Sequence, residues 1–86
     1  MASSIQTQRN LKEEVTLTPN GFLFDHVTGL TYTVNASGGL ILKHLMDGES
    51  AATTIKAMTS SFDVGESIAQ KDLEEFLEQV RAFGVL

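Results

Sequence analysis

Apolar and polar residues alternate over the first third of the chain. Val15 and Leu17 alternate with threonine, and this period of two predicts a half-buried strand. Residues 22–24 and 30–34 follow as two short segments rich in the aromatic and β-branched side chains that strands favour. The alternation therefore predicts three strands before residue 35.

Two segments between these strands contain the residues that turns require. Residues 19–21 have the sequence Pro-Asn-Gly, which interrupts the first alternation. Within residues 25–29, Asp25 can accept hydrogen bonds from neighbouring backbone groups, and Gly29 suits a positive φ. Because short turns join antiparallel neighbours, we expect a three-stranded antiparallel β-meander.

After these strands the spacing of apolar residues changes from two to three and four, which indicates helices. Asn35 and Ser50 stand where N-caps are expected, ahead of helices over residues 36–47 and 51–61. Residues 66–83 have the clearest helical period and predict a third helix with one long apolar stripe.

Three strands followed by three helices define an α+β fold. Gly48 and Gly84 follow the first and third helices, at the position where left-handed glycines end helices. A β-meander beside a three-helix cluster is similar to a winged-helix arrangement in which the sheet comes first. We expect residues 1–10, which hold little apolar surface, to be flexible and residues 11–86 to form one domain.

Composition and charge narrow the classes of function. The chain has 86 residues, no cysteine and a formal net charge of -5 at pH 7. The absence of cysteine excludes disulfides and thiolate metal sites, and it favours a cytoplasmic protein. The negative charge opposes binding to nucleic acid, and no apolar run is long enough to cross a membrane.

Few residues suggest catalysis or metal binding. The histidines are His26 in a turn and His44 on the outer side of the first predicted helix, and their spacing is not that of a metal-binding pair. The serines lack the Gly-x-Ser-x-Gly motif of hydrolases, and no P-loop motif follows Gly38-Gly39. We therefore expect no catalytic residue, metal or cofactor.

Short motifs spread over residues 21–86 resemble the PqqD family. They are the turn Asp25-His26-Val27-Thr28-Gly29, then Tyr32-Thr33-Val34-Asn35, then Leu45-Met46-Asp47-Gly48, the pairs Asp72-Leu73 and Phe76-Leu77, and the ending Gly84-Val85-Leu86. Each motif alone is common, and their order and spacing carry the resemblance. PqqD proteins proper have Cys-Asp-Gly at positions 46–48, so the resemblance implies the family and argues against pyrroloquinoline quinone synthesis itself.

The resemblance implies a non-catalytic recognition element, a chaperone that binds the leader of a ribosomally synthesised precursor peptide. The bound leader is presented to a modifying enzyme, such as a radical S-adenosylmethionine (SAM) enzyme. In that family the leader adds as an extra strand, which the edge position of the third strand permits. The expected peptide-binding residues are Leu30, Thr31, Tyr32, Thr33 and Val34 on the strand, with Leu73, Glu74, Phe76, Leu77, Val80 and Arg81 on the third helix.

Several alternatives stay open. The apolar stripe of the third helix is also typical of a core, so some of its residues are expected to be buried. Glu74, Glu75 and Glu78 fit either recognition of basic leader residues or an ordinary solvated helix face. The alternative function is a winged-helix DNA-binding or protein-dimerisation adaptor, and the edge strand can also pair with a second copy to form a homodimer. The sequence does not identify the precursor peptide or the enzyme.

Overall fold

The computed structural model describes residues 10–85, and this range forms three strands and four helices. In chain order they are α1 (Leu11–Glu14), β1 (Val15–Leu17), β2 (Phe22–Asp25), β3 (Thr31–Thr33), α2 (Ala36–Met46), α3 (Ala51–Phe62) and α4 (Glu66–Ala82). The strands form one antiparallel sheet in the order β1-β2-β3, and three helices follow it. The predicted α+β fold is confirmed.

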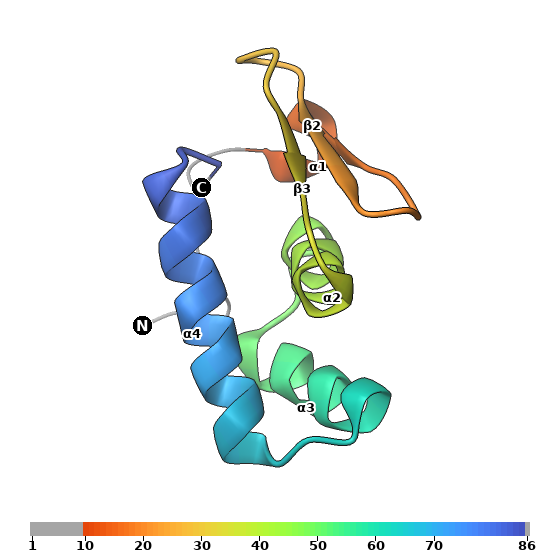
Figure 1. Ribbon diagram of the computed structural model, residues 1–86, viewed down its shortest axis with the longest axis vertical. Coiled ribbons are helices and arrows are strands. Elements are labelled where there is room, and N and C mark those ends of the chain that lie inside the picture. Colours follow the sequence, from red (N-terminus) through yellow and green to blue (C-terminus); the bar gives the residue numbers. More distant parts are fainter. Residues whose placement is uncertain (1–9, 86) are drawn as a thin grey trace.

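The elements are arranged around a single core. Figure 1 shows the sheet above α2, α3 below α2, and α4 running along one side from the level of α3 to that of the sheet. The side chains of one buried apolar cluster connect these layers: Leu11, Val15, Leu23, Ile41, Leu42, Leu45, Met58, Ala69, Leu73, Leu77, Val80 and Val85. Among the strands, β3 lies nearest to α4 (Figure 1).

The hairpin between β2 and β3 forms as the sequence predicts. Asp25 is buried, and its Oδ1 accepts hydrogen bonds from the N–H groups of Val27 (3.0 Å) and Thr28 (3.3 Å). Gly29 has a φ of 79°, a conformation that favours glycine. The turn is therefore held by a buried carboxylate in addition to its backbone.

The helix ends also follow the predicted caps. Asn35 Oδ1 accepts a hydrogen bond from the N–H of residue 38 at 2.8 Å, and Ser50 Oγ accepts one from the N–H of Thr53 at 3.1 Å. Gly48 and Gly84 have φ values of 72° and 78°. The three long helices consequently begin at the predicted residues and end within one residue of the predicted positions.

The short helix α1 is missing from the sequence-based prediction. It has four residues, too few to show a helical period, and Leu11 is its one buried residue. The carbonyl of Asn10 accepts hydrogen bonds from the N–H groups of Glu13 (3.1 Å) and Glu14 (2.9 Å). A turn this short is stabilised by the packing of Leu11 into the core. Apart from Asn10, the segment predicted to be flexible lies outside the described residues.

His44 corrects one expectation. It is half-buried instead of exposed on the outer side of α2, and its Nε2 is buried without a hydrogen-bond partner within residues 10–85. The reason is that α2 lies between the sheet and α3 (Figure 1), so more than one of its faces is covered. Among the helices of the described range, none has the length and apolar character of a membrane span.

Candidate functional site

The outer edge of β3 carries no partner strand from residues 10–85. On its other side, β3 is bonded to β2. Asp25 donates its N–H to the carbonyl of Leu30 at 2.9 Å, and Val34 donates its N–H to the carbonyl of Gly21 at 2.8 Å. These two hydrogen bonds show which residues of β3 direct their backbone N–H and C=O groups toward β2.

The backbone of an antiparallel ladder alternates, so every second residue from these bonded positions faces β2 and the residues next to them face the other way. Leu30, Tyr32 and Val34 direct their backbone groups toward β2, and Thr31 and Thr33 direct theirs away from it. Thr31 and Thr33 therefore present two N–H and two C=O groups along the outer edge. Of the five predicted strand residues, Thr31 and Thr33 can form backbone hydrogen bonds with a guest strand. The other three can contact it only through their side chains.

The opposite edge of the sheet, along β1, is partly closed by α1. His26 donates its N–H to the carbonyl of Glu14 at 2.9 Å, so the next residue, Val15, faces outward. The N–H of Val15 donates to the carbonyl of Leu11. The outward-facing N–H of Val15 is therefore already hydrogen-bonded within the chain and is not available to a guest strand.

Aromatic side chains connect β3 with the end of α4. The rings of Tyr32 and Phe83 have centroids 5.6 Å apart, and the Tyr32 hydroxyl donates to the carbonyl of Phe83 at 3.4 Å. Leu30 is 54% exposed and Phe83 is 63% exposed. Apolar surface therefore stays uncovered near Tyr32, at the start of β3 and at the end of α4.

Three of the predicted contact residues on α4 belong to the core. Leu73, Leu77 and Val80 are 3%, 9% and 5% exposed and lie in the same buried cluster as Leu42. Their spacing of three and four forms the stripe that faces the other helices. These three side chains are therefore not available to a ligand, whereas Phe76 is half-buried and lines a hollow.

The structure does not bring Glu74 and Arg81 to this hollow. At 3.6 residues per turn, both lie nearly half a turn around α4 from Phe76. The polar side chains of α4 that line the hollow beside Phe76 are Asp72, Glu75 and Gln79. The helical period of the sequence would have predicted these three residues if the rotation of α4 about its own axis had been known.

This hollow has a volume of about 210 Å³ and lies where α2 begins beside α4. We name it the polar hollow, and its lining residues are Asn35, Ser37, Ile41, Asp72, Glu75, Phe76 and Gln79. Asn35 follows Thr33 by two residues, so the polar hollow lies at the end of the free edge of β3. Two carboxylates and no cationic side chain among the described lining residues make it acidic.

Gly38 sets how closely α2 approaches α4 at the polar hollow. A Cβ at this position would lie 2.8 Å from Cε1 of Phe76 and 3.2 Å from Oδ1 of Asn35. Real Cβ atoms do not approach a ring carbon this closely without a shift. The absence of a side chain at Gly38 therefore lets the Phe76 ring pack against the start of α2.

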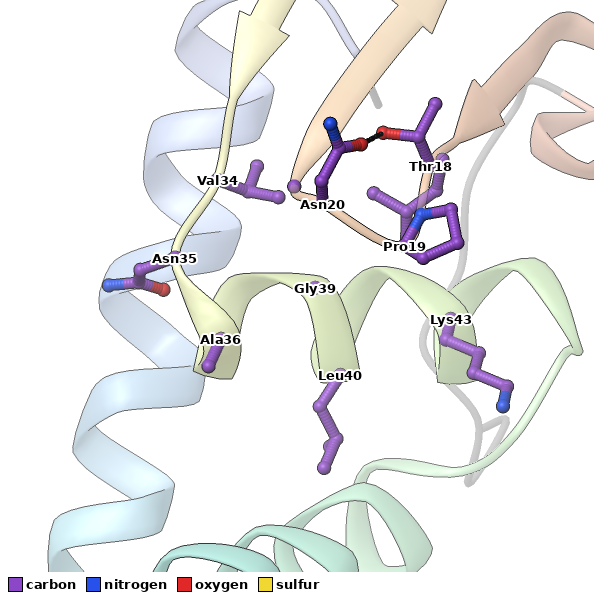
Figure 2. A pocket seen from close by; sticks show the side chains of 11 residues that line it. Thr18, Pro19, Asn20, Val34, Asn35, Ala36, Gly39, Leu40 and Lys43 are labelled. Carbon is purple, nitrogen blue, oxygen red and sulfur yellow. Dashed lines mark hydrogen bonds between the residues drawn. The ribbon is translucent and has the colours of Figure 1, made fainter.

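A second hollow, of about 570 Å³, lies on the other side of the junction between β3 and α2. Figure 2 shows it between the turn at Pro19 and Asn20 and the upper side of α2 at Gly39. In this view Val34 points toward the turn, and Asn35 points toward α4. The two hollows therefore open on opposite sides of the same short junction, and we name this one the turn hollow.

The histidine in the hairpin takes part in a local interaction. His26 Nε2 lies 2.6 Å from Oγ1 of Thr16, within hydrogen-bond distance. The described residues contain no group of three His, Asp or Glu side chains placed to hold a metal ion.

Residues 20–86 match the family model described as Coenzyme PQQ synthesis protein D (PqqD). The chain belongs to the PqqD family. Among solved structures, this PqqD-family chain is similar to "Lasso peptide synthetase B1 complexed with the leader peptide", with 27% sequence identity and a TM-score of 0.70. The similarity covers 84% of this chain and 88% of that chain. No curated protein matches. The resemblance expected from the sequence is thus confirmed.

Proposed function

We propose that this PqqD-family chain binds the leader segment of a ribosomally synthesised precursor peptide by strand addition. The observation that carries the proposal is the outer edge of β3, where Thr31 and Thr33 present their backbone groups. A guest backbone that pairs with these groups becomes a fourth strand, and its main-chain bonds supply affinity. The similarity to a lasso peptide synthetase B1 that is complexed with a leader peptide supports this class of ligand.

Side chains of the guest strand supply specificity, because they alternate between the two faces of the sheet. The guest residue opposite Tyr32 points to the same face as Tyr32, beside Phe83, and this setting favours an apolar side chain. The guest residue opposite Val34 lies next to the polar hollow, where carboxylates favour Lys or Arg. The proposed site comprises Leu30, Thr31, Tyr32, Thr33, Val34, Asn35, Asp72, Glu75, Phe76, Gln79 and Phe83.

The proposed role is binding and presentation, without chemistry performed by the chain on its ligand. The bound leader would be delivered to a modifying enzyme, and a radical SAM enzyme is the class that the family resemblance implies. A winged-helix DNA-binding role is the weaker candidate, because a net charge of -5 repels phosphates. A second copy of the chain could pair with the same edge of β3, and the experiment below separates this outcome.

The variant Thr33→Pro tests strand addition directly. The N–H of Thr33 faces away from β2, so proline removes a group offered to the guest without breaking the β2–β3 ladder. We expect affinity for a leader peptide that the unmodified chain binds to fall about tenfold, the effect of losing roughly one hydrogen bond. Titration of the isotope-labelled chain, followed by amide chemical shifts, measures it.

Thr33→Val is the matched control, because it keeps the N–H and removes only the hydroxyl group. We expect it to bind the leader as the unmodified chain does, with shift changes centred on the amides of residues 31 and 33. Equal binding by both variants, or shift changes confined to other elements, would contradict strand addition. If these amides shift with protein concentration in the absence of peptide, the edge pairs with a second copy instead.

A further inference from the structure

The turn hollow continues along α2 into a neighbouring depression. This depression, of about 400 Å³, shares Leu17, Thr18, Pro19 and Lys43 with the turn hollow and extends to Met46. Together they follow α2 over its 11 residues, a length of about 16 Å at 1.5 Å per residue. We name the combined surface the turn groove, and it is long enough for a short peptide segment.

The upper wall of the turn groove is held in place by hydrogen bonds. Thr18 Oγ1 donates to Oδ1 of Asn20 at 2.6 Å, and the N–H of Gly21 donates to the carbonyl of Thr18 at 3.1 Å. At the base of the turn, Thr18 donates its N–H to the carbonyl of Phe22 at 2.8 Å. A turn fixed in this way is preorganised, so binding of a ligand does not carry the entropic cost of ordering it.

Gly39 keeps the lower wall of the groove open. A Cβ at Gly39 would meet no atom within 4 Å, so packing does not require glycine there. Glycine also lowers the stability of a helix relative to alanine. A larger side chain at this position would fill the hollow that Figure 2 shows beside Gly39. The space is therefore available because residue 39 has no side chain.

The charge of the turn groove differs from that of the chain. Lys12 and Lys43 line it, and Asp47 is the one carboxylate among its described lining residues. The chain as a whole has a formal net charge of -5. An acidic segment is therefore repelled by most of the protein surface and attracted to the turn groove. Apolar side chains of such a segment can pack against Leu17 and Pro19, which line the groove.

We infer that the turn groove is a docking site for an acidic segment with interspersed apolar side chains, contributed by a partner protein. The groove lies on the side of the β3–α2 junction that faces away from α4 (Figure 2), so it leaves the edge of β3 free. A peptide on β3 and a partner in the turn groove can thus be bound together. The inference depends on the groove itself and holds whether or not β3 binds a leader.

Selection of peptides tests this inference on the full-length chain. A displayed library of random peptides of about 12 residues is selected on the immobilised chain, and enriched peptides are then titrated singly. We expect a class rich in Asp and Glu with interspersed Leu, Ile or Phe, and shift changes at the turn and at Gly39. Selection that yields no acidic class overturns the inference.

Two pairs of charge variants locate the binding of this class. Lys12→Glu with Lys43→Glu reverses the charge of the groove, and we expect affinity to fall about tenfold. Lys56→Glu with Lys71→Glu makes the same charge change on α3 and α4, and it should leave affinity nearly unchanged. Equal losses in both pairs would mean that the peptides respond to net charge, which overturns the site.

Gly39→Met tests the apolar part of the groove separately from its charge. Methionine favours a helix more than glycine does, so this variant is expected to fold, and its side chain occupies the turn hollow. We expect the acidic peptides to lose about tenfold in affinity, as for a blocked pocket. Unchanged binding overturns the inference. The inference is also overturned if the unmodified chain self-associates with rising concentration and Gly39→Met abolishes this self-association, because the groove would then bind a second copy.

Discussion

Gly38 lies where the start of α2 meets α4, and its replacement by alanine perturbs that contact with a single methyl group. A Cβ at Gly38 stands 2.8 Å from Cε1 of Phe76 and 3.2 Å from Oδ1 of Asn35. Carbon atoms attract best at separations of about 3.5–4.0 Å, so the Phe76 ring has to move. A moved ring also changes the polar hollow, which Phe76 lines.

Gly39 supplies a matched control, because a Cβ at this neighbouring position meets no atom within 4 Å. Each alanine variant gains about 0.5–1 kcal/mol of helix stability relative to glycine. The Gly38 variant alone also carries the cost of overpacking, which is about 1–3 kcal/mol for an added methyl group. Since the helical gain cancels, we expect Gly38→Ala to be less stable than Gly39→Ala by about 1–3 kcal/mol.

Thermal unfolding followed by circular dichroism measures this difference. For a domain of this size, 1 kcal/mol corresponds to a shift of about 4–8 °C in Tm. We expect Gly39→Ala to melt above the unmodified chain and Gly38→Ala to melt at or below it. Urea unfolding should rank the three proteins in the same order by midpoint, with similar slopes, because the surface exposed on unfolding is nearly the same.

Equal unfolding temperatures for the two alanine variants would refute the packing argument, because the Phe76 ring would then leave room at Gly38. Phe76→Leu provides a further check, since it removes the ring that the new methyl group meets. In that background Gly38→Ala should recover most of the helical gain. A deficit that persists with leucine at position 76 would assign the effect to the cap of Asn35 instead.

Two further predictions concern the cap of α2 and the polar hollow. Asn35→Ala removes the capping oxygen and should destabilise the chain by about 1 kcal/mol in urea unfolding, whereas Asn35→Asp keeps an acceptor and most of the stability. Asp72→Asn with Glu75→Gln should weaken binding of leader peptides that place Lys or Arg at the polar hollow about threefold to tenfold, as fluorescence anisotropy would show. Glu74→Gln with Glu78→Gln removes the same charge from the far side of α4, and an equal loss there would indicate a general charge effect.

The boundaries of the elements could be predicted from the sequence because local chemistry sets them. Asn35 and Ser50 cap the helices that follow them through bonds to residues three positions later. Gly48 and Gly84 adopt the left-handed conformation that ends a helix. None of these interactions depends on how the helices pack. Within residues 10–85 the helix that was missed, α1, is held by the burial of Leu11, a tertiary contact that no local pattern reveals.

The candidate site could be predicted only in part, because it depends on the rotation of α4 about its own axis. The apolar stripe shows that one side of this helix is buried, but not which flank of the stripe faces β3. From the sequence, Leu77 therefore fitted both the core and the leader-binding site, and Glu74 fitted a polar position beside that site. Packing against the other helices fixes the rotation and places Glu75 and Gln79 at the hollow instead.

The adjacent glycines of α2 illustrate how the fold separates residues that look alike in the sequence. Gly38 is required by the fold, because the Phe76 ring occupies the space of its side chain. Gly39 is required by no contact within the described residues, and it borders the turn hollow. Two glycines weaken the start of a helix, and departures from local preference are expected where a surface serves binding. Gly39 borders the turn hollow, so the one of these two glycines that no packing contact explains lies at a surface for which binding is proposed.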